Sequence, residues 1–374
     1  MNTRTESYQA SENEKPFANG LDGSSSPKKS QTERLMDLCE TVELFHSTDN
    51  EQYATIKLNN HEETWALKSS EFKSWLRQQY YSKSGSVPSD KVFQDVLQTL
   101  EARAMFEGKQ HRVYIRVAHH QDKIYLDLTN DSWQVVEVTS SGWKIINKSP
   151  VKFRRAKGME PLPHPIDVRS PEKAINLLRP FVNVESDCDF KLLVGWLLSI
   201  LGTAGPYLVL VLYGEQGTAK STTVKVLRSL ADPNASPLRR PPKNTDDLMV
   251  MAKWNHIVAI DNMSSLPDWL SDDLCVLSTG GGLSKRKHHS NDEEIVLDAK
   301  RPIIANGIDE FVARGDLASR SIFLSLPLIE GYARKSERDI WKLFADSKGL
   351  VFLALLSAVS VGLKNISSVV HSEN

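Results

Sequence analysis

The chain has 374 residues, 40% of them hydrophobic, and a formal net charge of −1 at pH 7. That length predicts two soluble domains. A charge so close to zero excludes a global attraction to DNA or to a membrane surface, so any nucleic-acid site must be a local patch. Cys39, Cys188 and Cys275 lie too far apart for a disulfide framework or a zinc-ligand spacing.

The first segment predicts a tail and a small domain. Residues 1–28 are polar, with no apolar stretch typical of a signal peptide, so we expect a cytoplasmic protein with a disordered tail over 1–31. Residues 32–149 are expected to form an α+β domain. Its predicted elements are a helix ending near 38, strands at 53–58 and 65–67, helices opened by Ser69 and Ser89, and an antiparallel meander over 113–118, 123–128, 133–138 and 143–146.

A basic, proline-rich stretch over 150–169 is predicted to be a linker. It carries four cations that could contact nucleic-acid phosphates, and the alternative is a solvated connector. These cations are Lys152, Arg154, Arg155 and Lys157.

The segment 170–374 alternates helical and strand patterns and predicts an α/β domain with a mostly parallel sheet covered on both faces. Strands are expected at 207–213, 255–262, 301–308 and 321–327. The uncharged run 192–214 is long enough to span a bilayer, but the residues 202–206 divide it into a core helix and a buried strand. We expect no membrane span, and a buried helix over 349–363.

The segment 207–223, YLVLVLYGEQGTAKSTT, is an apolar strand followed by a glycine-rich turn and a helix. Such a loop wraps phosphates with backbone N–H groups, a lysine reaches the β/γ oxygens, and a hydroxyl holds Mg²⁺. Ala219 replaces the usual second glycine, which the turn tolerates if its φ is below zero. The sequence therefore predicts ATP and Mg²⁺ binding rather than a structural turn. The predicted ATP-binding residues are Gly214, Glu215, Gln216, Gly217, Thr218, Ala219, Lys220, Ser221 and Thr222.

Asp261 ends the second strand, where an acid beside a phosphate loop holds Mg²⁺ together with Ser221. A strand-end turn is the alternative. The next position, which usually carries a water-activating acid, is Asn262, and an amide cannot take a proton. Either another carboxylate does so or hydrolysis is slow. The carboxylates considered for this role are Asp246, Asp247 and Glu215.

Two further polar groups are candidates for contact with the γ-phosphate. Asn306 ends the third strand, where it either senses that phosphate or forms an Asn-Gly turn. Arg314 and Arg320 follow, and a guanidinium there either stabilises transition-state charge across a subunit boundary or forms a surface salt bridge. Arg320 is preferred because it directly precedes a strand.

A dense basic cluster follows Gly280–Gly282 and precedes an alternating segment, so we expect a β-hairpin with a basic tip that grips single-stranded DNA in the pore of a ring. Solvated surface is the alternative. The predicted DNA-binding residues are Lys285, Arg286, Lys287 and His288. A smaller cluster at 239–243 could be a second contact.

Four segments, in order, resemble the A, B, B-prime and C motifs of superfamily-three helicases, the AAA+ type initiators and helicases of viruses, phages and plasmids: GEQGTAKST, HIVAIDN, TGGGLSKRKHHSND and RPIIANGI. Parts of this region are also similar to ATP-binding proteins of mobile elements, whose core often follows a primase-type module. The resemblance covers most of 33–330. It implies an α/β P-loop core, a homo-oligomeric ring such as a hexamer, and a primase or other replication partner. It also implies catalytic roles for Lys220, Asp261, Asn306 and Arg320.

Three functions stay open. The first is a DNA-dependent ATPase, a helicase-like motor in the replication of phage or mobile-element DNA. The second is a nucleotide-switched regulatory or loader ATPase with slow turnover and no unwinding, which Asn262 favours. The third is a scaffold whose phosphate loop has decayed and binds no nucleotide.

Overall fold

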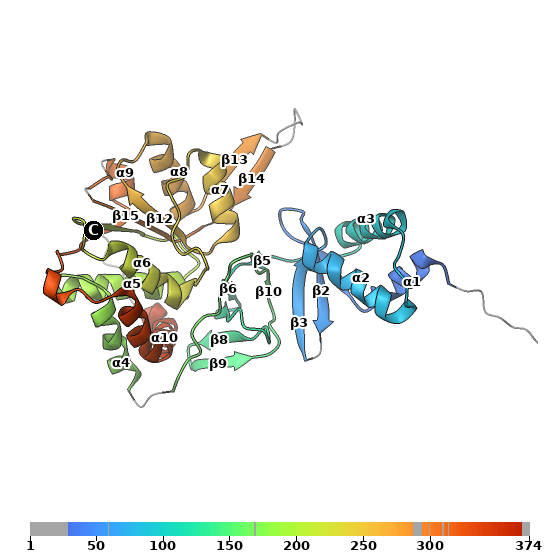
Figure 1. Ribbon diagram of the computed structural model, residues 1–374, viewed down its shortest axis with the longest axis horizontal. Coiled ribbons are helices and arrows are strands. Elements are labelled where there is room, and N and C mark those ends of the chain that lie inside the picture. Colours follow the sequence, from blue (N-terminus) through green and yellow to red (C-terminus); the bar gives the residue numbers. More distant parts are fainter. Residues whose placement is uncertain are drawn as a thin grey trace, which may run out of the picture.

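The computed structural model has a separate N-terminal unit, drawn in blue in Figure 1, beside a larger body. The structure describes residues 29–58, 60–167, 170–286, 294–298, 300–308, 310–312 and 314–368. The N-terminal unit packs three helices on a sheet of strand order β3-β2-β1-β4. Its elements are α1 (Gln31–Leu38), β1 (Glu43–His46), β2 (Gln52–Leu58), β3 (His61–Ala66), α2 (Ser70–Ser84), α3 (Asp90–Phe106) and β4 (Lys109–Gln110).

Local capping explains where these helices begin. The hydroxyl of Ser69 accepts a hydrogen bond from the Phe72 amide at 3.2 Å, and that of Ser89 accepts one from the Val92 amide at 3.4 Å. Each serine thereby satisfies a backbone donor that the first helical turn leaves free. Both predicted helix starts are confirmed.

A meander of strand order β6-β7-β8-β9 follows, as the alternating pattern predicted, but the first predicted strand, 113–118, is divided at Arg116, whose φ is 65°, and only its end belongs to the meander. Short strands β5 and β10 pair beside it in parallel. The elements are β5 (Val113–Tyr114), β6 (Val117–His120), β7 (Lys123–Asp127), β8 (Val135–Thr139), β9 (Gly142–Ile146) and β10 (Lys152–Phe153).

The remaining chain is a mixed α/β region around one parallel sheet of strand order β12-β15-β11-β16, which confirms the predicted parallel sheet. The strands are β11 (Val209–Tyr213), β12 (Val258–Met263), β15 (Ile303–Gly307) and β16 (Ser321–Ser325). The helices are α4 (Pro171–Ala174), η1 (Ile175–Phe181), α5 (Asp187–Gly202), α6 (Lys220–Ala231), α7 (Thr245–Trp254), α8 (Asp268–Thr279), α9 (Gly315–Ala318), η2 (Gly331–Ala333), α10 (Glu337–Asn365) and η3 (Ile366–Ser368).

Helices cover both faces of this sheet. Along β11, Leu210 and Leu212 pack with the cluster formed by α5, α6 and α10, whereas Val209 and Val211 pack with α7 and α8. Alternate side chains of a strand point to opposite faces, so a continuous apolar run is what a sheet buried on both sides requires.

The long helix α10 is, within the described residues, the one helix whose length and composition would let it cross a membrane. Of its apolar window, 56% is buried, and it packs against α4, η1, α5, β8 and β9. It is a core helix that includes the predicted helix at 349–363 and begins well before it. The run 192–214 is divided into α5 and β11, as expected.

Apolar packing groups the meander with the larger body. Leu126, Val136 and Val138 belong to the same buried cluster as α5 and α10, whereas α1, α2 and α3 share a separate cluster with β2. The boundary predicted at residue 149 stays a prediction, but the hydrophobic cores separate closer to residue 110.

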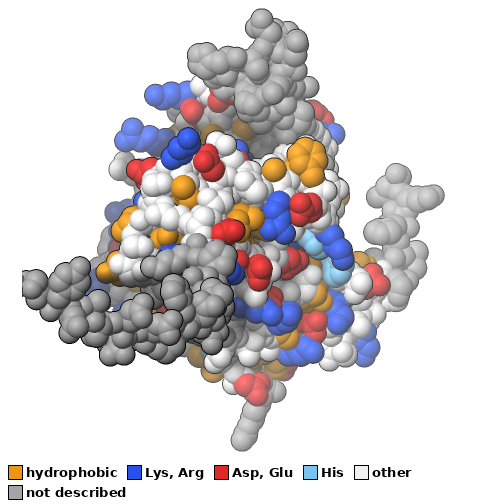
Figure 2. All heavy atoms as spheres, turned by 90° about the vertical axis from the view of Figure 1, so that its right-hand side faces the viewer, with side chains coloured by type: hydrophobic (Ala, Val, Ile, Leu, Met, Phe, Trp, Pro, Cys, Tyr) orange, Lys and Arg blue, Asp and Glu red, His pale blue; other side chains and the backbone are white. Residues whose placement is uncertain are grey.

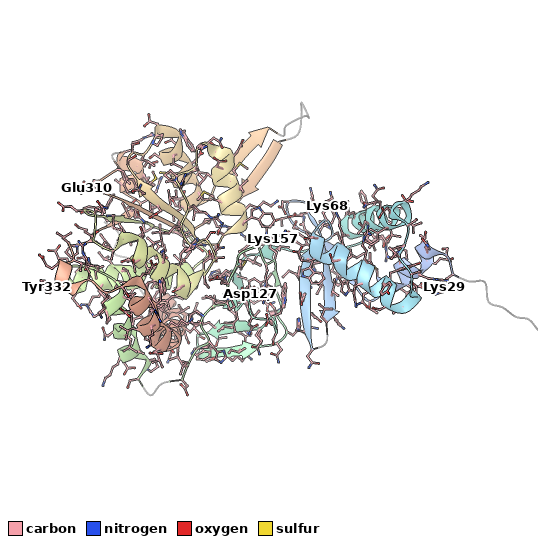
Figure 3. All side chains as sticks on the ribbon, viewed as in Figure 1. Lys29, Lys68, Asp127, Lys157, Glu310 and Tyr332 are labelled. Carbon is pink, nitrogen blue, oxygen red and sulfur yellow. The ribbon has the colours of Figure 1, made fainter. Side chains whose placement is uncertain are left out.

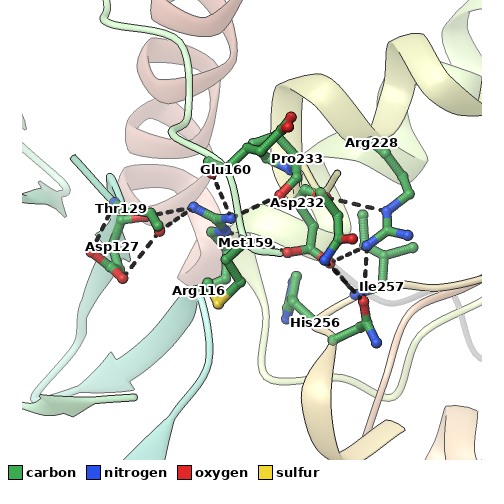
Figure 4. A network of polar contacts seen from close by, with 12 residues as sticks. Arg116, Asp127, Thr129, Met159, Glu160, Arg228, Asp232, Pro233, His256 and Ile257 are labelled. Carbon is green, nitrogen blue, oxygen red and sulfur yellow. Dashed lines mark hydrogen bonds and ion pairs between the residues drawn. The ribbon is translucent and has the colours of Figure 1, made fainter. Parts of the chain in front are cut away.

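A buried network of charges joins the meander to the α/β region (Figure 4). The fully buried Arg116 guanidinium donates to a carboxylate oxygen of Asp232 at 3.4 Å and to the Glu160 and Pro233 carbonyls. Arg228 donates to the other Asp232 oxygen at 3.0 Å. Burial alone would raise the pKa of the Asp232 carboxyl, but the two guanidiniums outweigh it and hold that pKa below its usual range.

Candidate functional site

The glycine-rich loop lies between the carboxyl end of β11 and the first turn of α6, at the centre of the parallel sheet. Gly214 has a φ of 147° and Gly217 a φ of 92°, which L side chains rarely adopt. A Cβ on Gly214 would lie 2.6 Å from the Leu326 carbonyl oxygen, so the chain after β16 closes against this glycine. The loop therefore requires glycine at both positions.

Ala219 departs from the expectation that its φ would be below zero. It caps α6 in the left-handed region, with φ 60° and ψ 27°. For a residue with a Cβ this conformation costs about 1–2 kcal/mol. The loop thus keeps the backbone shape of the usual glycine and carries the strain of an alanine in it.

Lys220 turns its ammonium back over the loop. Its Nζ donates to the Gly214 carbonyl at 2.6 Å, the Glu215 carbonyl at 2.8 Å and the Thr218 hydroxyl at 3.3 Å. Desolvation lowers the pKa of this lysine, and the Asp261 carboxylate opposes the shift in part. The cation is held beside the N-terminus of a 12-residue helix, where free N–H groups attract anions.

Three side chains from three different elements meet beside this loop. The Ser221 hydroxyl, in the first turn of α6, donates to Asp261 Oδ1 at 2.9 Å. Asn306 Nδ2, near the end of β15, donates to the same oxygen at 2.7 Å. Strand β15 lies between β11 and β12, so parallel strands bring all three to one edge of the sheet. The structure thus brings together Ser221, Asp261 and Asn306, which the sequence predicted separately.

Asn262 is linked to this group of side chains through its backbone amide. Its amide donates to Asn306 Oδ1 at 3.0 Å, and it has a φ of 59° where the pairing of β12 with β15 shifts register between Ile260 and Met263. Asn is among the residues that tolerate this conformation best. The bulge turns the Asn262 side chain outward, where it is exposed.

Of the alternative water-activating carboxylates, Asp246 and Asp247 lie in the first turn of α7, and Glu215 lies on the glycine-rich loop. Asp247 accepts a hydrogen bond from the Lys243 amide at the start of α7, and Glu215 is exposed on the loop. In the described part of the chain, the side-chain contacts of Asp261 are with Ser221 and Asn306, not with a second carboxylate.

The two candidate arginines lie away from the loop. Arg320 precedes β16, so it lies at the amino end of the sheet, opposite the loop, and its guanidinium pairs with Asp316 at 2.9 Å. Arg314 pairs with Asp272 at 2.6 Å. Neither arginine is brought to Lys220 of its own chain, and the role of Arg320 on a neighbouring subunit stays a prediction.

Two residues that sequence reasoning missed do reach the loop. A Cβ on Gly217 would lie 2.5 Å from Arg334 Nη2, so the exposed Arg334 guanidinium rests directly on the loop backbone. Asn183 Nδ2 donates to the Thr218 carbonyl at 3.0 Å and to the Pro327 carbonyl at 2.6 Å. No local signal marks Arg334, because it reaches Gly217 only through the path of the chain after β16.

The predicted hairpin is present as the antiparallel strands β13 (Gly282–Arg286) and β14 (Glu294–Asp298), which project from the larger body in Figure 1. Lys285 and Arg286 end β13, and Lys287 and His288 lie outside the described residues. On the face drawn in Figure 2, Lys and Arg are interspersed with Asp and Glu, in keeping with a net charge near zero.

The chemistry of these groups fits a nucleoside triphosphate and Mg²⁺. The hydroxyl of Ser221 and the carboxylate of Asp261 are hard oxygen donors 2.9 Å apart, the kind of ligand that Mg²⁺ takes. Lys220 and the amides of the loop are suited to phosphate oxygens. The remaining predicted ATP-binding residues lie in the loop or in the first turn of α6: Glu215, Gln216, Thr218 and Thr222.

Fold and site define a mixed α/β protein with polar side chains gathered at the carboxyl edge of a parallel sheet, around a glycine-rich loop. The chain belongs to the family of actinomycete integrative conjugative element replication proteins, whose model matches residues 174–371. No curated protein matches the chain.

Solved structures show distant likenesses. An A-form apo structure of the NrS-1 C-terminal region has a TM-score of 0.48 and 15% identity, covering 90% of this chain and 71% of that chain. A further apo structure of that region has a TM-score of 0.45 and 14% identity, with coverage of 90% and 71%. The JCV helicase has a TM-score of 0.33 and 14% identity, covering 53% of this chain and 60% of that chain.

Proposed function

We propose that this chain is an ATP-hydrolysing, helicase-like DNA motor that acts in the replication of an integrative mobile element. The observation that carries the proposal is the convergence of Ser221, Asp261 and Asn306 beside the Lys220 loop. Membership of a family of conjugative element replication proteins supports a role in the replication of such an element.

In this proposal each residue has one task. The Lys220 ammonium and the loop amides hold the phosphates, and the oxygens of Ser221 and Asp261 hold Mg²⁺, which neutralises phosphate charge. The Asn306 amide keeps Asp261 in place through its 2.7 Å hydrogen bond. Arg334, which already lies on Gly217, is placed to add a second positive charge to the phosphate site.

One observation favours a second candidate, a nucleotide-switched loader with slow turnover. The residue after Asp261 is an amide, its side chain is exposed, and its backbone is held by Asn306. An amide orients water but does not take its proton. Nucleotide binding would then change the contact between β12 and β15 rather than drive repeated hydrolysis.

The test is ATP hydrolysis with and without single-stranded DNA. We expect a rate that DNA raises and that Lys220→Ala lowers on the order of 10²–10³-fold, because this removes a charge aimed at the phosphates. The double variant Arg286→Ala plus Lys287→Ala should keep the basal rate and lose the DNA response. ATP binding with slow, DNA-indifferent turnover would instead establish the loader, and absence of ATP binding would overturn both.

A further inference from the structure

A cavity in the described part of the chain is separate from the glycine-rich loop. Its volume is about 840 Å³, at the upper end of the range for small-ligand sites, so it has room for more than one base. The N-terminal unit forms one wall, and the stretch after β10 and helix α7 form the others. In Figure 3, Lys157 lies where the N-terminal sheet meets the larger body.

Aromatic rings from three distant segments line this cavity. Trp65 comes from β3, Trp133 from the loop between β7 and β8, and Trp254 from the end of α7. Three of the eight tryptophans of the chain thus line one cavity. The Trp254 residue is 40% exposed, so part of its surface is free for a ligand. Aromatic faces of this kind stack on nucleic-acid bases of any sequence.

Two arginines hold two of these rings in place. Arg155 lies 3.8 Å from the centroid of Trp133 and pairs with Asp127 at 2.7 Å. Arg154 lies 4.8 Å from the centroid of Trp254. Trp133 has a φ of 50°, an outlier for a bulky residue, and such strain gathers at functional sites.

Some of the charged side chains that line the cavity have ion-pair partners and others do not. Arg154 is neutralised by Glu51 at 3.2 Å, and Glu63 pairs with His61 at 2.8 Å. Lys157 and Arg239 are exposed and form no ion pair with the described residues, so they can take phosphates. The carboxylates of the N-terminal unit, including Glu71, also line the cavity and can accept hydrogen bonds from base amino groups, and the Glu71 carboxylate interacts electrostatically with the Lys157 ammonium.

The cavity is connected to the candidate catalytic edge. The Arg239 carbonyl accepts a hydrogen bond from the Asp261 amide at 2.8 Å, and the Arg239 amide donates to the Ala259 carbonyl at 3.1 Å. A ligand on the Arg239 side chain is therefore one backbone hydrogen bond from the residue expected to hold Mg²⁺.

We propose that this cavity binds single-stranded nucleic acid, with bases stacked on the tryptophans and phosphates on Lys157 and Arg239. The site goes beyond the proposed function, because it includes neither the glycine-rich loop nor the hairpin. It is a second strand-binding site, apart from the hairpin, formed between the N-terminal unit and the larger body.

The test measures anisotropy of fluorescently labelled oligo(dT) and oligo(rU) strands on the full chain without nucleotide, across a series of salt concentrations. Lys157→Ala plus Arg239→Ala should weaken binding and reduce the salt slope by about 1.4, since each phosphate contact to a single strand contributes about 0.7. Trp254→Ala should weaken binding about 5- to 150-fold, and Trp254→Phe should restore most of it.

Matched controls separate the cavity from general charge. Lys342→Ala plus Lys348→Ala, two exposed cations on α10, should leave binding and slope unchanged. Binding of the oligo(dT) or the oligo(rU) strand that depends on Trp254 supports the proposal. The proposal is overturned if the cavity variants bind as tightly as wild type, which is the result expected when binding depends only on Arg286 and Lys287. It is also overturned if the wild type binds no strand. Because no nucleotide is used, a failed ATPase test leaves this result intact.

Discussion

Replacement of Arg116 by Met tests whether buried charge fastens the meander to the α/β region. Met keeps the Cβ and the apolar stem of the side chain but lacks the guanidinium, so the left-handed backbone of residue 116, with a φ of 65°, is equally strained in both proteins. The substitution removes donors to Asp232, to Thr129 at 2.6 Å, and to the Asp127, Glu160 and Pro233 carbonyls.

The free-energy cost of Arg116→Met depends on the partners that Asp232 keeps. Loss of one member of a buried charge pair costs about 3–5 kcal/mol, chiefly because the other charge is left without its partner. Here Asp232 keeps Arg228 at 3.0 Å and the Ile257 amide at 3.0 Å, so the lower part of that range applies. We expect Arg116→Met to cost about 3 kcal/mol. Asp232→Asn should cost more, about 4–5 kcal/mol, because two guanidiniums then lose their counter-ion.

Urea denaturation followed by circular dichroism measures both values. Arg103→Met is the matched control, since Arg103 pairs with Glu107 on the exposed surface of α3 at 2.9 Å, and such pairs contribute about 0–1 kcal/mol. A loss below about 1 kcal/mol for Arg116→Met, or a smaller loss for Asp232→Asn than for Arg116→Met, would refute the reasoning.

Three further predictions concern the loop, its neighbour and pH. Ala219→Gly should raise the free energy of unfolding by about 1 kcal/mol, because glycine adopts a φ of 60° without strain; a loss of stability in urea would contradict this. Arg334→Ala should weaken ATP binding about tenfold with unchanged thermal stability, whereas Arg320→Ala should leave ATP binding to the monomer intact; equal effects in a fluorescent-nucleotide titration would count against the Arg334 contact. Burial lowers the pKa of His256 from 6.5 to about 4, so the unfolded chain takes up the proton first, and stability should fall by about 3 kcal/mol as pH drops across that interval. His256→Gln should remove this slope in urea titrations at several pH values.

The sequence predicted the elements whose signals are local. Ser69 and Ser89 begin helices because a hydroxyl placed three residues before a free amide caps it, and this needs no distant partner. The strand, turn and helix around Lys220, the division of the run 192–214, and the hairpin of β13 and β14 follow from glycine positions and from periods of apolar residues. The predicted ends of β12 and β15 also placed Asp261 and Asn306 on one edge of the sheet.

The sequence did not reveal features that depend on distant contacts. The left-handed Ala219 was missed because an alanine by itself favours a negative φ, and the surrounding loop imposes the positive one. Arg334 reaches Gly217 only because the chain after β16 folds back over the loop. The alternation in the meander predicted a buried face but not the surface that covers it, which proved to be α5 and α10.

Local patterns thus determined which segments are helix, strand and phosphate loop, since backbone hydrogen bonding and side-chain period act over a few residues. Tertiary structure alone decided which surfaces meet: Arg116 with Asp232, and three tryptophans around one cavity. The physical reason is that burial stabilises any surface of matching shape that is apolar or whose charged groups are paired. Its partner is therefore selected by the packing of the whole chain rather than by neighbouring residues.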